Sequence, residues 1–304
     1  MRRIQTMGVA LAVPALVIAA AATQTVRAAG DAKATELMAQ ARTALGGEKQ
    51  IAKVKGLSFA GTAQRLIGDR QVSGELTIDL QLPDKMLRSD SISPMGDSAT
   101  VVTEQGLNGD SLIRSSRVIN APAGAMIRTP PPPTPGSDAE AQALRNSRAE
   151  LARLALSFLL SPPSSTSIEF AYGGEAESPD GKADVVDIKG DSSFTAKMFL
   201  DKASHRPLML AYRGVSPRVV VQTQRMSAPP PAQANEGGGR GALPAPPAPE
   251  VVDINMFFDD YKAVDGVMLP HHVSRSVDGQ TIEEWTFKSI KVNPTFKADA
   301  FSKK

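Results

Sequence analysis

Apolar and polar residues alternate strictly in the stretch GELTIDLQLPDKMLRSD, residues 74–90. The apolar positions are Leu76, Ile78, Leu80 and Leu82, and the polar positions beside them are Glu75, Thr77, Asp79 and Gln81. This pattern is typical of a β-strand with one dry face and one wet face. A dry face can pack into a core or line a cavity for an apolar ligand, so what it contacts determines the predicted function.

The same period of two covers most of the chain. It continues in LSFAGTAQR, KMLRSDSI, SATVVTEQ and SLIRSSR, and after residue 166 in SIEFAYGG, ADVVDIKG, FTAKMFLD, PLMLAYRG and RVVVQTQ. It ends with VVDINMFFDDY, where Ile254, Met256 and Phe258 are in phase, followed by VMLPHHVSRS and TIEEWTFKSIKV. Turns rich in Gly, Asp and Asn separate these segments, which therefore predict about a dozen antiparallel strands. A sheet of this size twists and curls on itself.

Two segments have the spacing of amphipathic helices. Residues 31–46 carry one apolar stripe and end at Gly46-Gly47, a helix stop. Ser137 and Glu140 fit a capping box before the second helix, which ends at Pro162-Pro163. Its apolar stripe comprises Leu144, Leu151, Leu154, Ala155, Phe158 and Leu159. The predicted fold class is therefore mainly β with two or more helices (α+β).

Two proline-rich segments interrupt this pattern, at about residues 120–137 and 226–250. Their composition cannot form the interior of a sheet or bury enough apolar surface to fold. The second lies between two strand patterns, so it is expected to be an overlong hairpin loop. We predict one domain over residues 29–304 with two flexible inserts.

The N-terminal residues 1–28 have the pattern of a secretory signal peptide. Arg2 and Arg3 precede the apolar run GVALAVPALVIAAAA, and the small-residue site Val26-Arg27-Ala28 follows. The mature chain is expected to begin near Ala29 and to be soluble after export. Without Arg2, Arg3 and Arg27, 31 of the 34 basic residues remain against 32 acidic ones. This balance argues against a nucleic-acid partner, which requires a basic surface.

No catalytic or metal-binding motif stands out. The chain has no cysteine, and the adjacent His271 and His272 point to opposite faces of a predicted strand, so no metal site is expected. We interpret the doublets Asp259-Asp260 and Glu283-Glu284 as turn and solvent-face residues. Serine-hydrolase and P-loop motifs are absent, and no cofactor or enzymatic activity is predicted. Trp285, the only tryptophan, fits either a core or a cavity floor.

The order of elements and short motifs resembles the LolA-like superfamily of periplasmic lipoprotein carriers, which includes LolB, mycobacterial lipid-binding lipoproteins and the N-terminal domain of RseB. The matching segments are Gly74-Glu75-Leu76 running into Pro83-Asp84-Lys85-Met86-Leu87-Arg88, then Asn108-Gly109-Asp110-Ser111-Leu112, Tyr261-x3-Asp265-Gly266-x2-Leu269-Pro270, and Asp299-x-Phe301. They are spread over most of residues 31–301.

The resemblance implies a curved antiparallel half-barrel whose concave apolar face is covered by helices that act as a lid. It implies a periplasmic carrier or chaperone that binds a lipid or the acyl chains of a lipoprotein, is monomeric, and has an inner-membrane release complex and an outer-membrane acceptor as partners. The expected cavity and lid residues are Leu76, Ile78, Leu80, Leu144, Leu151, Phe158, Ile254, Met256, Phe258 and Trp285.

Two alternatives remain open at this point. An RseB-like sensor or protein-interaction module would use the same fold, and a packed core with no ligand would show the same alternation. The family's latch arginine, placed just before the strand-ending proline, is replaced here by Leu82. Arg88 lies beyond that proline on the next strand, so the lid is expected to be held by other residues.

Overall fold

The computed structural model describes residues 18–68, 70–93, 99–120, 133–178, 181–191, 194–215 and 250–302, with side chains from residue 31 onward. The predictions for residues 1–17, for most of the two proline-rich inserts and for the strand pattern RVVVQTQ concern residues outside these ranges. The helices are α1 (Ile18–Ala44), α2 (Glu48–Ile51) and α3 (Asp138–Leu159). The first strands are β1 (Gly56–Ile67), β2 (Arg70–Gln81), β3 (Lys85–Ile92), β5 (Thr100–Asn108) and β6 (Ser111–Ile119).

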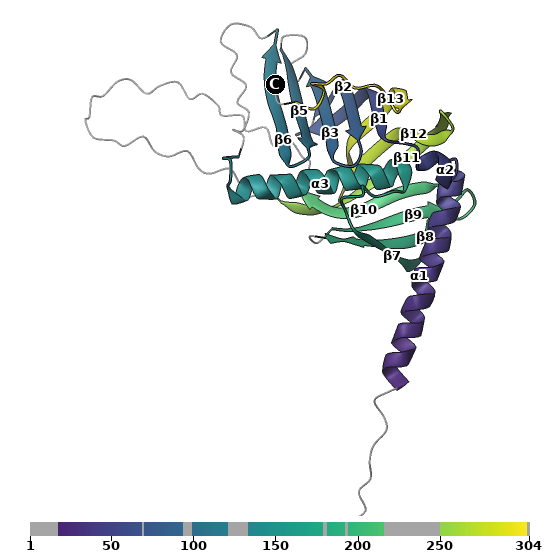
Figure 1. Ribbon diagram of the computed structural model, residues 1–304. Helices are drawn as coiled ribbons and strands as arrows, with labels where there is room; N and C mark the ends of the chain where they lie inside the picture. The colour runs from purple at the N-terminus through teal and green to yellow at the C-terminus, as the bar shows by residue number, and fades with distance from the viewer. Residues whose placement is uncertain are drawn as a thin grey trace, which may run out of the picture.

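After α3 the chain forms β7 (Ile168–Ser178), β8 (Gly181–Gly190), β9 (Thr195–Asp201), β10 (Pro207–Val215), β11 (Val251–Val264), β12 (Val267–Val277) and β13 (Gln280–Val292). Together the strands make one twelve-stranded sheet in the order β6-β5-β3-β2-β1-β13-β12-β11-β10-β9-β8-β7. The last strand, β13, pairs with the first, β1, and so joins the two halves of the chain. The sheet is antiparallel, open and curved (Figure 1), as the alternation predicts.

The second proline-rich insert connects two adjacent strands. Val215 at the end of β10 lies opposite Val251 at the start of β11. The chain therefore leaves and re-enters the sheet at paired positions of adjacent strands, and the hairpin-loop prediction itself concerns residues outside the described ranges.

The helix α3 crosses the concave face of the sheet, and α1 runs along β7 (Figure 1). At its N-terminus Ser137 Oγ accepts a 3.2 Å hydrogen bond from the Glu140 amide, as the capping box predicts. The Glu140 carboxylate, however, bonds the amide of Gly136, because the Ser137 amide already donates to the Thr134 carbonyl. Helix α1 ends as predicted, with Gly46 and Gly47 at positive φ.

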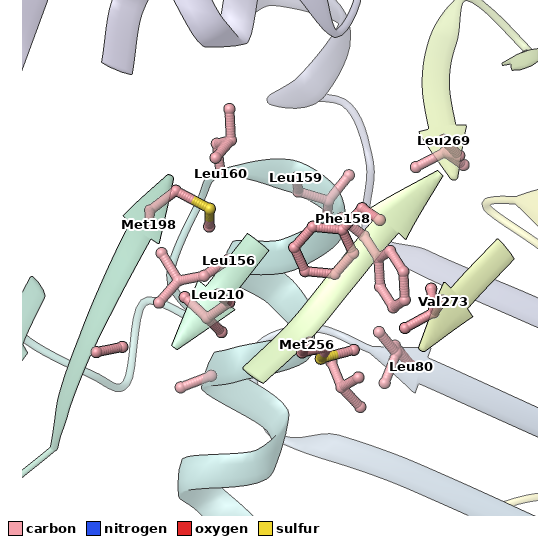
Figure 2. Close-up of a cluster of buried hydrophobic side chains, with 14 of the residues drawn as sticks. Leu80, Leu156, Phe158, Leu159, Leu160, Met198, Leu210, Met256, Leu269 and Val273 are labelled. Carbon is pink, nitrogen blue, oxygen red and sulfur yellow. The ribbon is translucent and has the colours of Figure 1, made fainter. Parts of the chain in front are cut away.

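A single hydrophobic cluster fills the space between α3 and the sheet. In Figure 2, Leu156 and Phe158 of α3 lie among strand side chains, with Leu80 and Val273 on one side and Met198 and Leu210 on the other. The ring centroids of Phe158 and Phe59 are 4.4 Å apart. Burying a large apolar side chain contributes about 1.5–3 kcal/mol, so this cluster is the main source of stability and positions α3.

Candidate functional site

The structure brings the predicted cavity residues together on the concave face. Leu76, Ile78, Leu80, Leu151, Phe158, Ile254, Met256, Phe258 and Trp285 all belong to the buried cluster, and Leu144 packs partly buried against it. The opening alternation therefore has its dry face toward α3. Most of these side chains are therefore buried within one hydrophobic cluster.

A pocket of about 920 Å³ runs along α3 beside this cluster. Its apolar wall includes Leu107 of β5, Leu151 of α3 and Ile254 of β11, and its polar wall includes Glu150, Arg153 and Arg275. Leu151 and Ile254 are the predicted site residues that line it. The volume lies within the range of about 300–1,000 Å³ that is common for small-molecule sites.

An arginine cluster borders this pocket through Glu150, Arg153 and Arg275. We use the term for four arginines and the three carboxylates they contact: Arg65, Arg88, Arg153, Arg275, Asp90, Glu150 and Glu283. Glu283 is 5% exposed and receives bonds of 2.5 Å from both Arg65 and Arg88. The interpretation of Glu283 as a solvent-face residue is therefore wrong.

The register of the sheet explains this burial. Arg275, Glu283 and Arg65 are directly opposite one another on β12, β13 and β1. Glu283 also shares the inward phase of Trp285, because alternate residues of a strand point to the same face. Its neighbour Glu284 points outward, as predicted. The alternation through TIEEWTF carried this signal, but the partner arginines lie far away in sequence.

Aromatic rings support the arginine cluster. The guanidinium of Arg275 lies 4.4 Å from the centroid of Trp285, and that of Arg88 lies 5.0 Å from it. Arg153 lies 4.3 Å from the centroid of Tyr212. Stacking of this kind suits arginine because its planar cation is weakly hydrated, and it fixes the direction in which the remaining N–H groups point.

The electrostatics of the cluster keep its groups charged. Burial raises the pKa of the Glu150 carboxyl, but Arg275 and Arg153 outweigh this effect and hold that pKa below its ordinary value. The same balance holds for Glu283, whose pKa is strongly lowered against the effect of burial by Arg88, Arg65 and Arg275. Both carboxylates therefore remain ionised at neutral pH and attract the arginines.

Polar contacts attach α3 to the sheet and to α1, and one of them is an ion pair between Arg148 and Asp110. Glu150 of α3 forms an ion pair with Arg275 of β12, which joins the helix to the sheet. Arg42 of α1 donates two hydrogen bonds, of 3.1 and 3.0 Å, to the carbonyl of Leu160 at the C-terminus of α3. Sequence reasoning missed the last two of these contacts, because their partners lie far apart along the chain.

Three further features of the described residues concern metal ligands, an acidic doublet and the length of the helices. No group of three or more His, Cys, Asp or Glu side chains in those ranges is arranged to hold a metal ion. Asp259 and Asp260 are exposed, as predicted. None of the helices, over the part of the chain that the structure describes, is long and apolar enough to cross a membrane.

Comparison with solved structures gives matches over most of the chain. A LolA superfamily protein from Nitrosomonas europaea is 9% identical, has a TM-score of 0.47, and the match covers 89% of this chain and 97% of that one. A DUF1329 family protein from Desulfovibrio piger matches at 8% identity and a TM-score of 0.42, covering 91% of this chain and 97% of that one.

A third match is an outer membrane lipoprotein-sorting protein domain from Vibrio parahaemolyticus. It is 8% identical, has a TM-score of 0.43, and the match covers 90% of this chain and 97% of that one. No family model matches the chain, and no curated protein matches it. At these identities and scores the likeness concerns the fold alone.

Proposed function

We propose that this protein is a periplasmic carrier that binds a lipid, or the acyl chains of a lipoprotein, between α3 and the concave face of the sheet, without catalysis. The pocket along α3 carries the proposal. Its volume of about 920 Å³ and its wall of Leu107, Leu151 and Ile254 suit an apolar chain. The buried side chains next to this wall would line an enlarged cavity once α3 moves outward.

The attachment of α3 supports a lid role. The helix is held to the sheet by side-chain packing and by the ion pairs Glu150–Arg275 and Arg148–Asp110, and it is not hydrogen-bonded into the sheet as a strand. A helix held in this way can move as a unit, because no sheet hydrogen bond has to break. An acyl chain would replace the apolar contacts that α3 loses, so opening and binding are coupled.

Solvent extraction of the purified protein followed by mass spectrometry tests the proposal. We expect acyl lipid in near-stoichiometric amounts. Ala149→Trp, which places a large side chain on the pocket wall, should reduce the recovered lipid several-fold. Ala141→Trp is the matched control, because Ala141 is exposed on the same helix and is not one of the residues that line the pocket. Protein that is free of lipid, before and after exposure to lipid vesicles, would contradict the carrier function.

A further inference from the structure

The arginine cluster has more positive than negative groups. Its four guanidinium groups face three carboxylates, which leaves one net positive charge in a largely buried place. Uncompensated buried charge is costly. The excess therefore calls for an anion at this position.

Hydrogen-bond donors of the cluster are also left over. The Nε atoms of Arg153 and Arg275 are buried with no hydrogen-bond partner among the described residues. Arg275 is 7% exposed and contacts Glu150 and Glu283 through its other nitrogens. Arg153 makes one ion pair, a long one of 3.5 Å to Glu150. Both arginines line the pocket along α3, so an oxyanion in that pocket can reach them.

The lid itself supplies one of the three carboxylates. Glu150 and Arg153 are on α3, whereas Arg65, Arg88, Arg275, Asp90 and Glu283 are on strands. When α3 moves outward, the strands retain three arginines against two carboxylates. Arg275 then loses its partner Glu150 and keeps a contact of 3.7 Å with Glu283.

We propose that the ligand is an anionic amphiphile whose oxyanion head group, of carboxylate type, replaces Glu150 on Arg275 while its apolar chain follows the wall of Leu107, Leu151 and Ile254. Glu150 thus occupies the head-group position in the closed protein and competes with the ligand for it. Re-formation of the Glu150–Arg275 pair displaces the head group and favours release. This inference rests on the proposed carrier function and adds the charge class of its ligand.

Small-molecule ligands can distinguish the carrier function from the proposed preference for an anionic head group. Calorimetry of the delipidated protein at pH 8 would compare decanoate, 1-decanol and acetate below their aggregation concentrations. Binding of 1-decanol tests the carrier function alone. We expect decanoate to bind at least ten-fold more tightly than 1-decanol, and acetate to bind far more weakly than either, because both the head group and the chain contribute. The emission of Trp285, which stacks on Arg275, should change with decanoate.

Substitutions in the Glu150–Arg275 ion pair should change the ratio of the affinities for decanoate and 1-decanol. Glu150→Gln should raise the preference for decanoate over 1-decanol about ten-fold, because it removes the competing carboxylate. If Glu150→Gln only loosened the lid, the affinities for decanoate and for 1-decanol would rise by the same factor. Arg275→Gln should abolish the preference. If that single variant fails to fold, the double variant Glu150→Gln/Arg275→Gln, which removes a matched pair, should likewise show no preference.

Glu175→Gln is the control, because it removes a carboxylate from an ion pair with Lys202 outside the pocket, and it should leave the ratio unchanged. Equal affinity of the wild-type protein for decanoate and 1-decanol, or a ratio unchanged in Glu150→Gln, would overturn the proposal while leaving the carrier function intact. Binding of acetate as tight as that of decanoate would overturn it as well, since the site would then take small anions without a chain.

Discussion

At the scale of single residues, the two faces of β2 have very different tolerance to change. Leu80 is 1% exposed in the core beneath α3, whereas Asp79 faces the other side of the sheet. Burial raises the pKa of Asp79, partly offset by a hydrogen bond with Ser58 and by Lys291. An amide can keep a hydrogen bond to Ser58, so that side of the strand accepts a neutral polar group.

Leu80→Asp should therefore unfold the protein or lower its free energy of unfolding by several kcal/mol, since an unpaired carboxylate would be buried. Asp79→Asn is the adjacent control and should change that free energy by about 0.5 kcal/mol or less. Urea unfolding followed by the fluorescence of Trp285 measures both. Similar values for the two variants would show that the assignment of faces is incorrect.

The sequence predicts the apolar face of each strand well but not the buried charges. Alternation is a local property, so the inward phase of Leu80, Ile254 and Met256 can be read directly. The pairing of Arg65 with Glu283 joins residues 218 positions apart and depends on β13 lying beside β1. No local sequence pattern specifies that β13 lies beside β1. The sequence indicates a buried charge only where a charged residue occupies an inward-facing position of a strand.

At the scale of elements, the Glu150–Arg275 pair decides how firmly α3 is held. The pKa of Glu150 is lower in the closed protein than its ordinary value of 4.5, and opening returns it toward that value. Protonation therefore favours the open form. The latch is fully present well above pH 4.5 and is lost as the pH falls through the lowered pKa.

Hydrogen exchange of the α3 amides tests this coupling. Glu150→Gln should reduce their protection at pH 7 by about ten-fold or more, since a hydrogen bond to a charged group contributes about 1.5–3 kcal/mol. In the wild-type protein, protection should fall toward the mutant value below about pH 4.5. Amides of β1 and β13 provide the control for global unfolding. Equal protection of α3 in both proteins at pH 7 would rule out the latch.

The elements themselves could largely be predicted from the sequence. The helix α3 and the described strands are found where the two periodicities place them. Helix α1 ends near the predicted Gly46-Gly47 stop but begins at Ile18, ahead of the predicted start at residue 31. The latch could not be predicted, because Arg42 contacts the Leu160 carbonyl 118 positions away. The position of the pocket was also beyond reach, since it depends on how far α3 stands from the sheet.

At the scale of the whole molecule, the account requires a sheet that stays rigid and one helix that moves. The sheet is continuous through the pairing of β1 with β13, so it holds the arginines of the strands, Arg65, Arg88 and Arg275, in fixed relation to Leu107 and Ile254 of the apolar wall. Helix α3 carries Glu150 and Arg153 of the cluster and Leu151 of the wall. A single rigid-body movement therefore exposes the apolar wall and Arg275 together.

Pinning α3 to the sheet tests this claim most directly. Ser157 Oγ of α3 and Met256 Sδ of β11 are 4.0 Å apart, and the chain has no native cysteine. A reducible bifunctional thiol reagent can therefore join Ser157→Cys to Met256→Cys. A cross-link between Thr77→Cys and Ser89→Cys, which are paired positions on β2 and β3, is the control that leaves α3 free.

The readout is calorimetric uptake of 1-decanol by the delipidated variants, with the extent of cross-linking verified by mass spectrometry. The account predicts that the link between α3 and β11 abolishes uptake, that reduction of the linker restores it, and that the control link has no effect. Undiminished uptake by the fully cross-linked protein would contradict the role of α3 as the lid.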